Sequence, residues 1–421
     1  MPKRSVAVAG AVAATLIVAS VGGLLLFGGS EEGASTSITQ AATTSTSSIA
    51  TTTTAATTTS STTTLPPGVP ITLTLEGNGE LQATAGDFYG WLGSPYRVEP
   101  PPMAEGLAAF LAGVEPEEGF DLTGASAAAD LDDGSRVAVI TADEDVLLAV
   151  DDGEGWRIVG AKLASLGLEA WYGEPIRYVL IIGTDARPGY IERVFRADSL
   201  HVLASNIGQQ AGAVVGIPRD AYVDAPYGGK DKLSSVNALA DSEAVVAIVR
   251  DLSGLPVEGY LITGFASFTS LVDNFGGVVV DVPFAMADPK SQAFLSAGEQ
   301  VLWGANALAF SRNRSIWGSD FTRSYHQGLV ILGGLDKAQA AGILALPGVL
   351  RLLCEYTWTD LSAEDLLTLA AGAFEIDPGT VGNIVLPGTI QMIGGASVVV
   401  LDPAAEQIYR DLDDGILTPA E

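Results

Sequence analysis

The sequence predicts an α/β protein in which a central mixed sheet is flanked by helices. From Tyr172 onward, strand-like apolar runs alternate with helix-like ones, which is typical of helices packed around one sheet. We place this domain at residues 172–415 and expect Ser362 to cap one of its last helices. The expected strands are Tyr178–Ile182, Leu200–Ala204, Ala213–Ile217 and Val278–Val282, and the expected helices are Ala238–Leu252, Phe265–Phe275 and Asp320–Leu335.

A small β-rich accessory domain is expected ahead of it, at residues 69–170. Its strand-like runs are separated by Asp/Gly turns. No catalytic constellation stands out there, so we expect a structural or positioning role. The runs are Ile71–Leu75, Arg136–Ala142, Val146–Asp151 and Trp156–Ala161.

The N-terminus has the pattern of a membrane anchor. Lys3 and Arg4 precede the uncharged apolar run Ser5–Phe27, which as a helix is long enough to cross a bilayer core. The basic flank predicts a single-pass protein of the cell membrane, with residues 1–28 as cytoplasmic tip and transmembrane helix and the catalytic domain extracytoplasmic. The alternative is a cleaved signal peptide.

Residues 29–68 consist mostly of Thr, Ser and Ala. Such a tract cannot bury enough apolar surface to offset the entropy of ordering it. We expect a disordered stalk between the anchor and the folded domains.

The overall charge excludes one class of partner. The chain has 421 residues, of which 48% are hydrophobic, enough for a large core. Its 21 Lys and Arg face 50 Asp and Glu, a formal charge of −29, which would repel a phosphate backbone, so no nucleic-acid partner is expected. The single cysteine, Cys354, excludes an internal disulfide framework.

The few cations are grouped. Nine of the 21 lie in three short segments that each follow or interrupt an apolar run, as loops at the end of a sheet do. Guanidinium groups that converge in one cleft would fit a polyanion. The nine are Arg187, Arg193, Arg196, Arg219, Lys230, Lys232, Arg312, Arg314 and Arg323.

The first segment carries two aspartates, Asp185 and Asp198, at adjoining strand ends. One or two carboxylates, with substrate phosphates and water, are how proteins commonly hold Mg²⁺. The alternative is that both aspartates cap turns or pair with Arg187 and Arg196.

The second and third segments supply arginines, whose planar fork suits phosphate. Arg219 is followed by Asp220, and a surface salt bridge between them is the alternative. If the third segment is a strand, Arg312 and Arg314 point to the same side, and Arg323 and Gln327 share one helical face.

At these motifs the chain resembles the LytR-CpsA-Psr family of cell-wall glycopolymer transferases, from about Tyr178 to Gly415. The motifs are Gly183-Thr184-Asp185-Ala186-Arg187, Arg196-Ala197-Asp198-Ser199, Ile217-Pro218-Arg219-Asp220, Lys230-Asp231-Lys232-Leu233, Gly276-Gly277-Val278, Arg312-Asn313-Arg314 and Asp320-Phe321-Thr322-Arg323.

The resemblance implies a substrate bound through its pyrophosphate. It implies that Mg²⁺ is held by Asp185 and Asp198, and that Asp220 positions Arg219, these four being the catalytic candidates. The residues expected to hold the phosphates are Arg196, Arg219, Lys232, Arg312, Arg314, Arg323 and Gln327.

The resemblance also implies a hydrophobic tunnel for the polyprenyl tail. Its candidate residues are Phe265, Phe268, Leu271 and Val272, whose helical spacing equally fits an ordinary core helix.

The implied activity is transfer of a glycopolymer, with its phosphate, from a polyprenyl-pyrophosphate carrier to a peptidoglycan hydroxyl. Asp185 or Asp198 would be the general base. The alternatives are a hydrolase of the same lipid pyrophosphate, and a non-catalytic receptor or regulator that binds lipid-linked glycan. The chain departs from the family pattern at Leu233-Ser234, His326 and Gly328, which leaves the polymer and the acceptor sugar open.

Overall fold

The computed structural model describes residues 68–76, 78–94, 99–187, 194–314 and 320–418. The expected anchor at 1–28 and all but the last residue of the expected stalk at 29–68 lie outside these ranges. Within them, no single helix has the length and apolar character needed to cross a membrane, and one helix pair that meets both criteria together is bent by 106°.

The central sheet is mixed, as predicted, and it has six strands. Its order is β17-β12-β7-β8-β9-β18. The neighbours β12 and β7, and likewise β9 and β18, are parallel, and the other pairs are antiparallel. The strands are β7 (Ile176–Thr184), β8 (Ala197–Asn206), β9 (Ala211–Gly216), β12 (Tyr260–Thr263), β17 (Trp358–Thr359) and β18 (Gly382–Val385).

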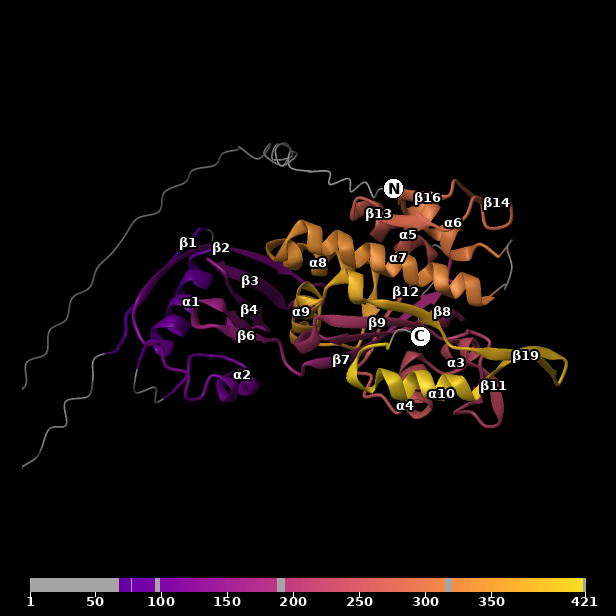
Figure 1. Ribbon diagram of the computed structural model, residues 1–421, viewed down its shortest axis with the longest axis horizontal. Coiled ribbons are helices and arrows are strands. Elements are labelled where there is room, and N and C mark those ends of the chain that lie inside the picture. Colours follow the sequence, from indigo (N-terminus) through magenta and orange to yellow (C-terminus); the bar gives the residue numbers. More distant parts are fainter. Residues whose placement is uncertain (1–67, 77, 95–98, 188–193, 315–319, 419–421) are drawn as a thin grey trace, which may run out of the picture. The chain divides into compact units, whose positions relative to one another are not determined.

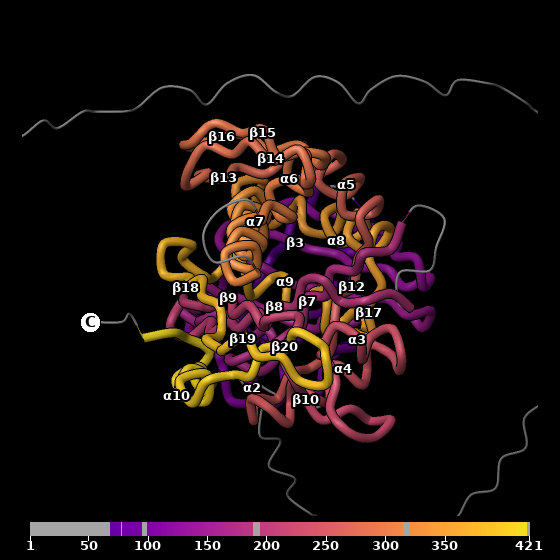
Figure 2. Tube along the Cα trace, turned by 90° about the vertical axis from the view of Figure 1, so that its right-hand side faces the viewer, coloured from indigo at the N-terminus to yellow at the C-terminus, as the bar shows by residue number. Residues whose placement is uncertain are grey.

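Helices cover both faces of this sheet (Figures 1 and 2). Because side chains alternate along a strand, Leu180 of β7 packs toward one face with helices α3 (Leu233–Leu239), α4 (Ser242–Ser253) and α10 (Pro403–Asp411). Val179 packs toward the other face, on α8 (Leu346–Tyr356) and α9 (Ala363–Gly372). The long helix α7 (Asp320–Ala341) lies on this second face.

Two details of the predicted domain are wrong. The expected helix Ala238–Leu252 is broken, because Asp241 begins α4 as its N-cap and accepts a 2.7 Å hydrogen bond from the Ala244 amide. Val278–Val282 is a strand, β13, but it pairs with β16 (Gly298–Leu302) in a separate two-stranded sheet. Apolar periodicity identifies a strand but does not identify its partner.

The other expected elements of this domain are observed. Helix α5 spans Phe265–Asn274, and the Ser362 hydroxyl caps α9 by accepting a 3.1 Å hydrogen bond from the Asp365 amide. Near the sheet end lie α6 (Gly304–Arg312) and the short hairpin of β14 (Met286–Asp288) and β15 (Ala293–Leu295). Two further ribbons join β10 (Tyr222–Asp224) to β11 (Lys230–Lys232) and β19 (Gly388–Ile393) to β20 (Ala396–Leu401).

The N-terminal part of the described chain forms a second six-stranded sheet. It contains β1 (Ile71–Glu76), β2 (Phe120–Asp130), β3 (Arg136–Ala142), β4 (Asp145–Asp151), β5 (Arg157–Leu163) and β6 (Leu168–Trp171), in chain order. Helices α1 (Gly79–Leu92) and α2 (Glu105–Phe110), which the sequence analysis missed, pack on one face. The opposite face shares a core cluster with α8 and α9.

Candidate active site

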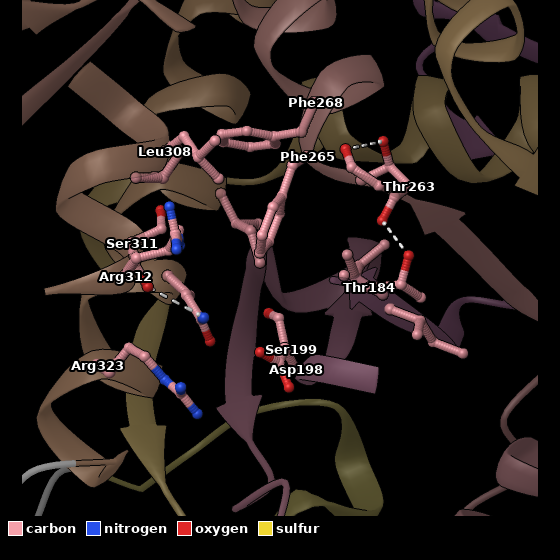
Figure 3. A pocket seen from close by; sticks show the side chains of 17 residues that line it. Thr184, Asp198, Ser199, Thr263, Phe265, Phe268, Leu308, Ser311, Arg312 and Arg323 are labelled. Carbon is pink, nitrogen blue, oxygen red and sulfur yellow. Dashed lines mark hydrogen bonds between the residues drawn. The ribbon is translucent and has the colours of Figure 1, made fainter. Parts of the chain in front are cut away.

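A β-bulge shapes the end of the central sheet. Gly183 of β7 pairs with Ser199 of β8, but the next residue, Thr184, pairs with Ala197, so Asp198 is an extra residue. Without a bulge, Asp198 and Ser199 would point to opposite faces of the sheet. Instead both line the same cavity (Figure 3).

A polar cavity of about 750 Å³ lies at this end of the sheet. Four arginines line it, together with two of the aspartates predicted from sequence and residues 287–291, which form the end of β14 and the turn that follows it. The charged residues from the predicted motifs are Asp185, Arg187, Asp198, Arg312, Arg314 and Arg323.

An apolar cavity of about 110 Å³ adjoins it. The two share Asp198, Phe265, Arg312 and Arg323, and the apolar side is continued by residues such as Phe268. Figure 3 shows the aromatic rings above and the guanidinium of Arg323 pointing toward Asp198 below. The site can therefore accept a ligand with a charged part and an apolar part.

Asp320, at the start of α7, lies close to three arginines from three segments of the chain. Its carboxylate lies 3.6 Å from Arg219 Nε, 3.5 Å from Arg314 Nε and 3.4 Å from Arg323 Nη2. Arg323 is 4% exposed. Burial lowers the pKa of Arg323 to about 10, with Asp320 opposing this and Arg219 and Arg314 adding to it.

Arg219 joins the second segment to the bulge. Its Nη1 donates a 2.6 Å hydrogen bond to Asp198 Oδ1, and its Nε lies 3.9 Å from Asp220. Burial acts to lower the pKa of Arg219, but Asp198, Asp320 and Asp220 together outweigh burial and raise it. Asp220 also pairs with Lys232 at 3.3 Å. The alternative partners considered for Asp198 from sequence, Arg187 and Arg196, are not the ones observed.

The strand expected around Arg312 and Arg314 is wrong. Arg312 is the last residue of α6, and Asn313 follows with extended backbone angles. The segment begins Gly304-Ala305-Asn306-Ala307, and its alanines favour a helix. The chain turns out of the helix at Asn313, and both arginines still line the polar cavity. Arg312 also lies over the Phe265 ring, 4.8 Å from its centre.

The other predicted residues divide into two groups. Arg323 and Gln327 lie on one face of α7 and both line the apolar cavity, as the helical spacing predicted. Arg196 is exposed and lines neither cavity, and Lys230 pairs with Asp224 on an exposed ribbon.

The candidate residues for the lipid tail also divide. Phe265 and Phe268 line the apolar cavity. Val272 is buried in the core cluster between β13, α6 and α7, and Leu271 does not line the cavity. The helix α5 therefore serves partly as the core helix that was the alternative.

The polar cavity contains a carboxylate oxygen that stands out among the described residues. Asp185 Oδ1 is buried and has no hydrogen-bond partner among the described residues. A carboxylate oxygen in that position fits a cation ligand, because a buried acceptor without a partner is unfavourable. Within the described ranges, no group of three or more His, Cys, Asp or Glu is arranged to hold a metal.

Several residues of the site have no role predicted from the sequence. Asp320 and Ser199 stood inside quoted motifs, where their position beside Arg323 and Asp198 was the available signal. Asp288 and Lys290 line the polar cavity from the β14–β15 hairpin. Only the Asp288-Pro289 turn signal marked that loop, and it did not indicate where the loop lies.

Comparison with known proteins identifies the family. The LytR_cpsA_psr family profile matches residues 173–413. The polyisoprenyl-teichoic acid–peptidoglycan teichoic acid transferase TagT of Bacillus subtilis is 29% identical over 200 residues, which are 45% of this chain and 62% of that protein. The probable cell wall biosynthesis protein LcpB of Corynebacterium glutamicum is 30% identical over 181 residues, 40% of this chain and 43% of that protein.

A solved structure agrees on the fold. The crystal structure of TagV from B. subtilis superposes with a TM-score of 0.51 at 22% identity, over 59% of this chain and 100% of that one. The chain spans less than two thirds of the length of the two curated relatives named above. Since the family profile covers more than half of its residues, the chain belongs to the LytR-CpsA-Psr family.

Proposed function

We propose that this protein is a phosphotransferase that moves a glycopolymer, with its phosphate, from a polyprenyl-pyrophosphate carrier to a hydroxyl of peptidoglycan. The observation that carries the proposal is the pair of adjoining cavities, one lined by four arginines and the other apolar. Together they match a pyrophosphate joined to a hydrocarbon tail. The names of TagT and LcpB, a teichoic acid transferase and a probable cell wall biosynthesis protein, are consistent with this.

The tail would enter the apolar cavity past Phe265 and Phe268. That cavity shares Ile331 with a second apolar cavity of about 210 Å³ between the central sheet and helices α7, α8 and α9. A long chain could continue there, where Leu335 and Leu350 are among the lining residues. Burial of apolar chain stabilises the complex by about 25 cal/mol for each Å² removed from water.

The pyrophosphate would lie against Arg312, Arg314 and Arg323. In the proposed reaction, an acceptor hydroxyl oxygen forms a bond to the sugar-linked phosphorus and gives its proton to the carboxylate of Asp185 or Asp198, the general base. The bond from that phosphorus to the bridging oxygen breaks, and polyprenyl phosphate leaves with that oxygen. Catalysis of this kind depends on positioning and on neutralising charge, which prepositioned guanidinium groups supply.

We also propose that the site takes Mg²⁺. Asp185 and Asp198 would hold it, and the absence of a hydrogen-bond partner for Asp185 Oδ1 among the described residues supports this. The cation would supply further neutralisation of the phosphate charge. Arg219 keeps the Asp198 carboxylate in place through its 2.6 Å hydrogen bond.

The membrane arrangement belongs to the proposal as well. We propose that residues 1–28 anchor the chain in the cell membrane with the N-terminus in the cytoplasm, that residues 29–68 form a stalk, and that the catalytic domain is extracytoplasmic. The sheet of β1–β6 would act as an accessory domain that packs against α8 and α9. These two helices line the second apolar cavity.

The test is a transfer assay with the full-length chain in detergent, a polyprenyl-pyrophosphate glycan, Mg²⁺ and peptidoglycan fragments. We expect a covalent phosphodiester product on the fragment and release of polyprenyl monophosphate only when the fragment is present. Release without the fragment would instead identify a hydrolase. Binding without release would identify a receptor.

A further inference from the structure

A buried histidine lies behind the bulge and contacts a serine of the site. His201 is 0% exposed and sits on β8, two residues after Ser199. Its Nδ1 lies 3.2 Å from Ser199 Oγ, and its Nε2 lies 2.9 Å from the backbone carbonyl oxygen of Ser324 on α7. Gly216 on β9 allows Ser324 to lie this close to His201, because a Cβ at position 216 would be 2.3 Å from Ser324 Oγ.

These contacts determine where the protons are. A carbonyl oxygen only accepts, so Nε2 carries the hydrogen and Nδ1 of the neutral ring is an acceptor. Ser199 therefore donates its only hydroxyl proton to Nδ1. The ring is 0% exposed, and neither residue that it hydrogen-bonds is acidic among the described residues, which favours the neutral form of the imidazole.

The hydroxyl oxygen is left as an acceptor that faces the cavity. Ser199 lines the apolar cavity beside Asp198, and Figure 3 shows the two side chains next to each other at the bulge. The lone pairs of Ser199 Oγ and the carboxylate of Asp198 are both electron-rich. Together they repel a phosphate oxygen and attract a cation. Serine hydroxyls are established ligands for Mg²⁺ at phosphate-binding sites.

A nucleophilic role for Ser199 is disfavoured by the same contacts. His201 would have to take the proton and become an imidazolium in a fully buried position, which is strongly unfavourable without a carboxylate partner. Its hydrogen-bond partners within the described part of the chain are Ser199 and Ser324, and neither is acidic.

We propose that Ser199 is a third protein oxygen ligand for the divalent cation held by Asp185 and Asp198, and that His201 is the positioning residue that turns the Ser199 lone pairs toward it. This inference rests on the cation site of the proposed function. It adds a hydroxyl ligand and a buried imidazole to that site.

The test is calorimetric titration of Mg²⁺ alone into the full-length chain in detergent. Ser199→Ala should weaken Mg²⁺ binding by about three- to tenfold, and Ser199→Thr, which keeps the hydroxyl, should bind like the parent. His201→Phe should weaken binding by about tenfold, as loss of an orienting partner does. His201→Asn should restore most of the affinity, because its amide oxygen can accept the Ser199 hydrogen bond.

The double variant Ser199→Ala/His201→Phe should bind no more weakly than the weaker of the two single variants, because both changes remove the same interaction. Ser126→Ala is the control for changing a strand serine, because the hydroxyl of Ser126 on β2 has no hydrogen-bond partner in the described part of the chain. Melting temperatures without Mg²⁺ distinguish a variant that folds poorly from one that only binds Mg²⁺ more weakly. If His201→Phe does not fold, the Mg²⁺ affinity of Ser199→Ala tests the proposed ligand.

The outcomes separate this inference from the proposed function. If Asp198→Ala abolishes Mg²⁺ binding while Ser199→Ala binds like the parent, the third ligand is overturned and the cation site stands. If the parent binds no Mg²⁺, both the cation site and the third ligand fall. If the affinities follow the expected pattern but no glycopolymer is transferred, the ligand assignment stands and the proposed reaction fails.

Discussion

Arg219 and Asp198 form the hydrogen bond that joins the second cationic segment to the bulge of β8, with Nη1 and Oδ1 2.6 Å apart. Both side chains are about one fifth exposed. Asp198 is the extra residue of the bulge and has no paired residue on β7. Its carboxylate is held instead by Arg219, which follows the end of β9. Arg219 itself does not line the polar cavity, whereas Arg312 and Arg314 do. The first prediction concerns these two arginines.

Arg312→Ala and Arg314→Ala should each weaken binding of a polyprenyl-pyrophosphate glycan by about tenfold or more, because hydrogen bonds to charged groups contribute roughly 1.5–3 kcal/mol. Lysine at either position should restore part of the affinity, since it keeps the charge and loses the planar fork. Arg351→Ala, an exposed arginine on α8, is the matched control. Equal affinity of all variants and the parent would remove the physical basis of the anion site.

Asp320→Asn should leave Arg219, Arg314 and Arg323 close together without their shared carboxylate. We expect the melting temperature without ligand to fall by about 2–4 °C, for roughly 1 kcal/mol of lost ion pairing. Inorganic pyrophosphate should then stabilise the variant more than it stabilises the parent. Thermal unfolding with and without pyrophosphate measures both effects.

Asp281→Asn, on the exposed side of β13, is the control for that experiment and should behave like the parent. If pyrophosphate stabilises Asp320→Asn no more than the parent, Arg314 and Arg323 do not belong to the anion site.

Phe268→Ala should weaken binding of long-chain polyprenyl pyrophosphates by about tenfold, because a buried phenylalanine contributes roughly 1.5–3 kcal/mol of apolar contact. A short-chain analogue of about ten carbons should lose less. Phe294→Ala is the control, since Phe294 is 62% exposed on β15. The same loss for both chain lengths would place the tail elsewhere.

The stability of the protein should fall in mild acid partly through His326. This ring is 1% exposed and stacks on Phe310, with ring centres 4.6 Å apart. Burial lowers the pKa of His326 to about 4, whereas an unfolded histidine titrates near 6.5. The unfolded chain therefore binds more protons between these values, so the contribution is complete above about pH 6.5 and is lost as the pH falls toward about 4.

His326→Phe keeps the stacking and removes this titration. The free energy of unfolding of the parent should fall relative to that of the variant by up to about 1.4 kcal/mol per pH unit in this window. Urea unfolding of both proteins at several pH values between 4.5 and 7.5 gives the difference. Parallel curves over the whole window would contradict the assignment.

Gly304→Ala should destabilise the wall of the site. A Cβ at Gly304, the first residue of α6, would lie 2.1 Å from the backbone oxygen of Thr269 on α5. Separating these helices should cost about 1–3 kcal/mol. Gly348→Ala on α8 is the control, since nothing lies within 4 Å of its added Cβ, and it should be neutral or stabilising by up to about 1 kcal/mol. Melting temperatures of the two variants decide.

The sequence by itself determined three strands of the central sheet, β7, β8 and β9, and the helices α5 and α7. Long apolar runs and helical spacing are local signals, so β7, β8 and β9 and the shared face of Arg323 and Gln327 could be recognised without neighbours. The ordered motifs likewise indicated the family, which the profile over residues 173–413 confirms.

The tertiary structure alone decided how these pieces meet. The bulge that brings Asp198 and Ser199 to one cavity is a mismatch between two strands, and neither strand shows it alone. The gathering of arginines on Asp320 and the approach of His201 to Ser324 join residues up to 123 positions apart. Such contacts depend on strand pairing and helix packing between distant segments, whereas sequence patterns report only the preferences of neighbouring residues.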